Sequence, residues 1–71
     1  MTDYVLELIR SLEISWKHNN YESIVFSLIN KMVYTCTIED ITYINRYFFK
    51  ITAETSTVFV NINNLSSVEL I

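Results

Sequence analysis

Apolar residues recur at intervals of three and four positions along the first part of the chain. The stripe consists of Val5, Leu8, Ile9, Leu12 and Trp16. This spacing places them on one face of a helix. Asp3 near the start and Lys17 and His18 at the end suit the helix dipole. The pattern predicts a helix over about residues 3–18.

Two further stretches repeat this helical spacing. In residues 21–34 the apolar positions are Ile24, Val25, Leu28, Ile29, Met32 and Val33. In residues 38–50 and just beyond they are Ile41, Ile44, Tyr47, Phe48 and Ile51. Thr37 and Asp40 have the spacing of a capping box, which favours a helix start at this point. We therefore expect helices over about residues 21–34 and 38–50.

The pattern changes near residue 57. Residues 57–62 are mostly β-branched or aromatic, which predicts a strand. Residues 65–71 fit a returning second strand or a last helical turn, because Ser66 and Glu69 have capping-box spacing. The expected fold is mainly α: one domain over residues 1–71, a small three-helix bundle with a C-terminal strand or hairpin. The alternative is an α+β fold.

Composition favours association with a partner. A chain of 71 residues lies near the lower limit for independent folding, yet 51% of its residues are hydrophobic and 14% aromatic. Cys36 is the only cysteine and His18 the only histidine, so neither an internal disulfide nor a Cys/His metal site is available. We expect a homodimer or a surface that binds another protein.

Charge and the missing residue types exclude several functions. The net charge of −3 and the scattered bases argue against general affinity for nucleic acid and suit a basic partner surface. The chain has no glycine and no proline, which excludes a glycine-rich phosphate loop and a nucleophile elbow. Residues 1–4 lack the basic start of a signal peptide, and no apolar run approaches a membrane span. We expect a cytoplasmic protein.

Catalytic arrangements are not indicated. Cys36 and His18 lie in different predicted corners, so they do not form a nucleophile and its base. Glu39 and Asp40 are neighbours in sequence and do not face each other on a helix. We expect no enzyme activity, no cofactor and no metal.

One cluster stands out as a candidate interface. Aromatic residues and bases alternate at Tyr43, Arg46, Tyr47, Phe49 and Lys50. Tyr, Phe and Arg are enriched at protein-binding hot spots, so these residues are candidates for a partner interface or self-interface. The same residues fit ordinary core packing with one exposed edge, or stacking on single-stranded nucleic acid. A helix over residues 38–50 that reads DNA is a further alternative, which its acidic start disfavours.

Residues 19–52 resemble a family of small enterobacterial regulators of biofilm formation and acid resistance that connect to a two-component phosphorelay. The matching residues are Asn19, Asn20, Ile24, Ser27, Leu28, Ile29, Thr35, Ile38 and Ile44, with Thr52 and Ala53 after a shift. The resemblance covers about half the chain and consists mostly of cap and core residues. It implies an all-helical, dimeric regulator without catalysis.

The functional expectation is a non-enzymatic, acidic protein-binding protein. An inhibitor or adaptor of the phage or mobile-element type, which modulates a host protein, agrees best with the aromatic surplus and the missing chemistry. The alternative is a dimeric transcription-associated regulator or two-component connector, associated with DNA or with a response regulator. Salt dependence separates the two, because DNA binding weakens steeply as salt rises.

Overall fold

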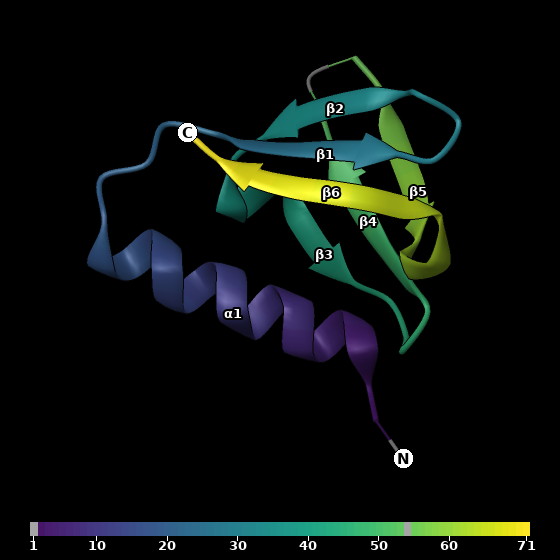
Figure 1. Ribbon diagram of the computed structural model, residues 1–71, viewed down its shortest axis with the longest axis horizontal. Helices are drawn as coiled ribbons and strands as arrows, with labels where there is room; N and C mark the ends of the chain where they lie inside the picture. Colours follow the sequence, from purple (N-terminus) through teal and green to yellow (C-terminus); the bar gives the residue numbers. More distant parts are fainter. Residues whose placement is uncertain (1, 54) are drawn as a thin grey trace.

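The computed structural model describes residues 2–53 and 55–71, and within them the chain forms one α-helix followed by six strands (Figure 1). The elements in chain order are α1 (Tyr4–His18), β1 (Ile24–Leu28), β2 (Val33–Cys36), the 3-10 turn η1 (Ile38–Asp40), β3 (Ile41–Tyr43), β4 (Phe48–Thr52), β5 (Thr57–Asn61), the 3-10 turn η2 (Ile62–Asn64) and β6 (Leu65–Leu70). The fold is therefore α+β.

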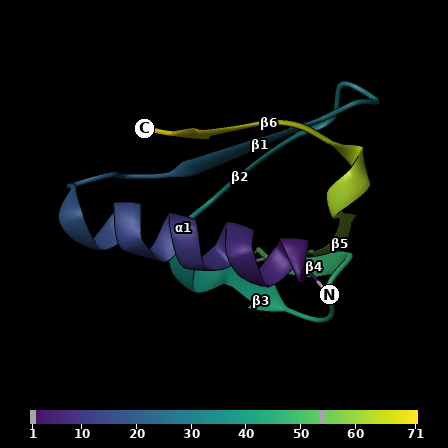
Figure 2. The ribbon, with the colours of Figure 1, turned by 60° about the horizontal axis from the view of Figure 1, so that its bottom comes forward.

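The strands form two antiparallel three-stranded sheets. The first sheet has the order β2-β1-β6 and the second the order β3-β4-β5. The chain passes from the first sheet to the second through η1 and returns through η2. Figure 2 shows the two sheets as separate layers, with α1 along their side. The helix contacts η1 and β3, so it covers the side on which the chain crosses from the first sheet to the second.

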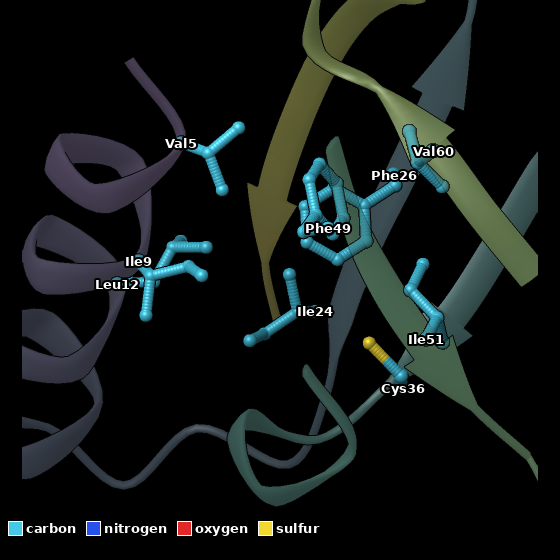
Figure 3. Packing of buried hydrophobic residues seen from close by; sticks show 9 residues of the cluster. All are labelled: Val5, Ile9, Leu12, Ile24, Phe26, Cys36, Phe49, Ile51 and Val60. Atoms are coloured by element: carbon cyan, nitrogen blue, oxygen red, sulfur yellow. The ribbon is translucent and has the colours of Figure 1, made fainter. Parts of the chain in front are cut away.

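The core lies between the two sheets and the inner face of α1. Its buried members are Val5, Ile9, Leu12, Ile24, Phe26, Cys36, Phe49, Ile51 and Val60 (Figure 3). The rings of Phe26 and Phe49, one from each sheet, lie with their centroids 5.2 Å apart. Because side chains alternate between the faces of a strand, each central strand contributes every second residue to this core.

The predicted helix over residues 21–34 is wrong. These residues form the hairpin of β1 and β2. Ile24 and Phe26 point into the core at a spacing of two, and Lys31 turns the chain with a positive φ of 71°. Apolar residues are so frequent in this stretch that a helical spacing and a strand spacing both fit. Only the polar residues of the turn distinguish a hairpin from a helix here.

The predicted helix over residues 38–50 is also wrong. Asp40 does accept hydrogen bonds from the Thr37 backbone amide (2.9 Å) and hydroxyl (3.1 Å), but the capped segment is only the short turn η1. It leads into β3, a tight turn and β4. The helical spacing was accidental, because inward positions in β4 alternate with a period of two at Phe49 and Ile51.

Other predictions agree with the structure. The first helix is confirmed by α1, and β5 lies within the strand predicted over residues 57–62. Residues 65–70 form the strand β6, so the helical turn is wrong. The C-terminal hairpin is also wrong, because β6 pairs with β1 and β5 pairs with β4 in the other sheet. The three-helix bundle is contradicted, and so is the all-helical fold that the resemblance implied.

Candidate functional site

The five residues predicted as an interface do not share one surface. Tyr43 is the last residue of β3, and Arg46 and Tyr47 lie in the turn before β4. Lys50 lies on β4, and its side chain is partly exposed. Phe49 is 0% exposed and packs in the core (Figure 3). The structure therefore gathers Tyr43, Arg46 and Tyr47 at one end of the second sheet. The register puts Tyr43 on the face of Phe49 and Lys50 on the opposite face, and Phe49 itself is buried in the core.

The turn between β3 and β4 is held by the side chain of Asn45. Its Oδ1 atom accepts hydrogen bonds from the backbone amides of Tyr47 (2.9 Å) and Phe48 (3.0 Å). Asparagine suits this role because its short side chain can replace a backbone acceptor in a turn. The Arg46 Cζ atom lies 4.8 Å from the centroid of the Tyr47 ring, a cation–π contact. The turn thus presents a cation and an aromatic ring as one unit.

The hydroxyl of Tyr43 links this turn to the start of α1. It donates a hydrogen bond to Oδ2 of Asp3, whose Oδ1 caps the helix by accepting from the Leu6 amide (3.0 Å). The hydrogen bond from Tyr43 lowers the pKa of Asp3 below 3.8, and the Arg46 charge acts in the same direction. The same bond raises the pKa of Tyr43 above 10.0. Both shifts favour the charged carboxylate paired with the neutral phenol.

The outward face of the second sheet is aromatic. In β4, Phe48 and Lys50 alternate with the inward Phe49 and Ile51. Lys50 is flanked across the sheet by Thr42 of β3 and Phe59 of β5. Phe59 is 64% exposed and Phe48 is 37% exposed. We call Phe48, Lys50 and Phe59 the outer face.

Sequence reasoning missed Phe59 as a candidate, and it placed Phe48 in the apolar stripe of the predicted helix over residues 38–50. A period of two along residues 48–52 would have placed Phe49 inside and Phe48 outside. In the predicted strand over residues 57–62, the same period separates Phe59 from its neighbours Val58 and Val60. The signal was present, and the wrong helix over residues 38–50 concealed half of it.

The described residues offer an exposed surface rather than an enclosed site. Within residues 2–53 and 55–71 there is neither a pocket nor a cluster of His, Cys, Asp or Glu able to hold a metal ion. Cys36 is buried in β2, where burial and the charge of Asp40 raise its pKa to about 11, so its thiol is protonated at neutral pH. Among the described helices, none has the length and apolar character needed to cross a membrane.

Comparisons with known proteins found no match for this chain. No protein-family model matches this chain, and no curated protein or solved structure is significantly similar to it.

Proposed function

We propose that this chain is a non-enzymatic protein-binding module, an inhibitor or adaptor, that binds its partner through the outer face and the adjoining turn. The observation that carries the proposal is the exposure of two phenylalanines on one sheet face. Phe59 is 64% exposed and shares its face with the exposed Phe48, and exposed apolar residues that share a face mark interaction sites more often than single ones do. Aromatic side chains at such positions supply much of the binding energy of protein interfaces.

The charges near this face indicate the chemistry of the partner. Lys50 lies within the outer face, and Arg46 lies in the adjoining turn, stacked on Tyr47. The carboxylate of Asp3, bonded by Tyr43 and by the helix amide of Leu6, lies at the start of α1 and interacts with the Arg46 charge. Lys50 therefore gives the outer face a positive charge, although the chain carries a net charge of −3. This face suits an apolar partner surface bordered by carboxylates, rather than the basic surface expected from net charge.

We also place the protein in the cytoplasm. Its single thiol, Cys36, is free and buried, which is compatible with a reducing compartment.

A pull-down with the tagged full chain, in the presence of nuclease, tests the proposal. The variant Phe48→Thr/Lys50→Thr removes two outer-face side chains from the central strand of the second sheet, and threonine is compatible with a strand. The matched control is Val25→Thr/Ser27→Thr, at the corresponding outward positions of β1 in the first sheet. We expect the outer-face variant to bind its protein partner at least about tenfold more weakly and the control within about twofold.

Two results would contradict the proposal. Equal retention of the partner by both variants would move the binding site off the outer face. Recovery of nucleic-acid-associated proteins that disappear with nuclease, with binding that weakens steeply as salt rises, would favour the DNA-associated regulator instead.

A further inference from the structure

The free edge of β5 offers a complete set of backbone hydrogen-bonding groups. The Ile62 amide donates to the Tyr47 carbonyl (2.7 Å) at one end of the β4–β5 ladder, and the Ala53 amide donates to the Ser56 carbonyl (2.8 Å) at the other. Hydrogen-bonded pairs alternate along an antiparallel ladder. Counting inward from both ends, every second residue of β5 directs its amide and carbonyl toward β4.

The remaining residues of β5 direct their backbone groups away from the sheet. By this alternation, the backbone amides and carbonyls of Val58 and Val60 point toward β4. Those of Thr57, Phe59 and Asn61 therefore point to the free edge. β5 is the last strand of its sheet and contains no charged residue. Charged residues, especially lysine, and proline are the usual means of preventing edge pairing, and β5 has none of them.

The side chains of β5 are arranged symmetrically about Phe59. The sequence Thr-Val-Phe-Val-Asn reads as polar, valine, phenylalanine, valine, polar in both directions. An antiparallel copy centred on Phe59 would therefore place phenylalanine opposite phenylalanine on the outward side and Val58 opposite Val60 on the inward side. Thr57 would face Asn61. A two-fold interface needs this kind of self-complementarity, because one patch must fit itself.

The other edge strands lack this combination of features. β3 lies beside α1, and its Tyr43 bonds to the helix cap at Asp3. β6 carries Glu69 and has a register irregularity in its pairing with β1 near Leu28. β2 is only four residues long, Val33–Cys36. An antiparallel copy of any of these strands would not repeat its own order of side chains.

We propose that two copies of this chain pair β5 with β5 in antiparallel register around a two-fold axis at Phe59. Phe59 exchanges amide and carbonyl hydrogen bonds with the same residue of the second copy, and Thr57 does so with Asn61. The two second sheets then form one continuous sheet with β5 of each copy at its centre. The two outer faces become one surface, which gives the dimer two equivalent binding positions for a partner.

Dimerisation is tested on the purified chain by sedimentation or light scattering over a range of concentrations, without any partner. Phe59→Glu places like charges opposite each other across the two-fold axis, while within the chain it faces Lys50 favourably. Thr42→Glu is the matched control, because Thr42 faces Lys50 from the other edge of the same sheet. We expect Phe59→Glu to weaken dimerisation at least about tenfold, and Thr42→Glu to leave it within about twofold. A wild-type chain that stays monomeric, or equal effects of both variants, overturns the proposal.

Cysteine cross-linking tests the register and remains informative if Phe59→Glu fails to fold. Thr57→Cys and Asn61→Cys chains are mixed under mild oxidation, and we expect disulfides between the two variants in preference to disulfides within either one. Cys36 does not interfere, because its thiol is buried and its pKa is raised to about 11. Ser67→Cys, on β6, is the control. Cross-links from Ser67→Cys to either β5 variant would show pairing of β5 with β6 and overturn the proposal.

Since the dimer is measured without a partner, the two proposals fail separately. A dimer whose outer-face variant still binds the partner disproves the proposed function alone. A monomer whose outer-face variant loses the partner disproves this inference alone.

Discussion

The two sheets are alike on the side that faces the core and different on the side that faces solvent. Inward, each central strand contributes a phenylalanine, Phe26 from β1 and Phe49 from β4, and the two rings are in contact. Outward, β1 carries Val25 and Ser27, whereas β4 carries Phe48 and Lys50. Packing requires the inner faces to match each other, but it places no such demand on the outer faces. The proposed binding role accounts for this difference between the outer faces, which packing does not require.

The largest expected effect tests whether the inner faces are equivalent. Phe26→Ala and Phe49→Ala should each reduce the free energy of unfolding by about 3–5 kcal/mol, because each removes a fully buried ring. A domain of this size has a total stability of roughly 4–11 kcal/mol, so either change brings the chain close to unfolding. Urea denaturation followed by circular dichroism measures the loss.

The control for this comparison is Phe48→Ala, next to Phe49 but on the outer face. We expect it to change the free energy of unfolding by about 1 kcal/mol or less. The effects of Phe26→Ala and Phe49→Ala should not add in the double variant, since the two rings contact each other. If one of the core variants is tolerated and the other is not, the two sheets do not share a single core.

The sequence predicted the fold well where only one spacing fits. In α1 the apolar residues recur at three and four, and most residues between them are polar, Leu6 and Ile14 excepted. Val5, Ile9 and Leu12 are buried as expected. In residues 21–34 apolar residues occupy adjacent positions, as at Ile24 and Val25, so helical and strand patterns cannot be told apart by periodicity. The pairing of strands distant in the sequence then decides, and local spacing carries no information about it.

The candidate residues were chosen by type, and the sequence did not show which face of the sheet each would occupy. Tyr43, Arg46, Tyr47 and Lys50 stand out by residue type alone, but the register puts Tyr43 on the face of Phe49 and Lys50 on the opposite face. Phe49 was included because a helix over residues 38–50 gives no reason to bury it rather than Phe48. Phe59 joins the outer face only through its pairing with Lys50, a contact that requires the β4–β5 register. Residue type was visible in the sequence, and the side of the sheet was not.

A smaller effect distinguishes the β1–β2 turn of the first sheet from the β3–β4 turn of the second sheet. Both turns are built without glycine. In the first sheet Lys31 adopts a positive φ of 71°, a conformation that costs a residue with a Cβ about 1 kcal/mol. Lys31→Gly should therefore raise the free energy of unfolding by roughly 0.5–1 kcal/mol. In the second sheet the turn depends on the Asn45 side chain, which accepts from the amides of Tyr47 and Phe48.

The matched change in the second turn should act in the opposite direction. Asn45→Gly removes both side-chain hydrogen bonds and should lower the free energy of unfolding by about 1 kcal/mol. Thermal and urea unfolding of the two variants measure the pair. The same sign for both changes would show that the turns are stabilised in the same way.

The smallest effect concerns the link between the second sheet and the helix. Tyr43→Phe removes the hydrogen bond to Asp3, and the resulting loss of stability should depend on pH. The pKa of Asp3 is lowered, so its contribution is present above pH 3.8 and is lost as pH falls through the lowered pKa. The pKa of Tyr43 is raised, so its contribution is present below pH 10.0 and is lost as pH rises through the raised pKa.

The difference in melting temperature between the wild-type chain and Tyr43→Phe should therefore be greatest between these limits and shrink at both ends. In an Asp3→Asn background, the acid-side change in that difference should disappear, because no carboxylate remains to titrate at the helix cap. The helix packs on the first sheet through the apolar core that it shares with Ile24 and Phe26, and such packing does not depend on pH. A constant difference across the whole pH range would mean that Tyr43 supports the helix by packing alone, and that the charged cap plays no part in joining the helix to the second sheet.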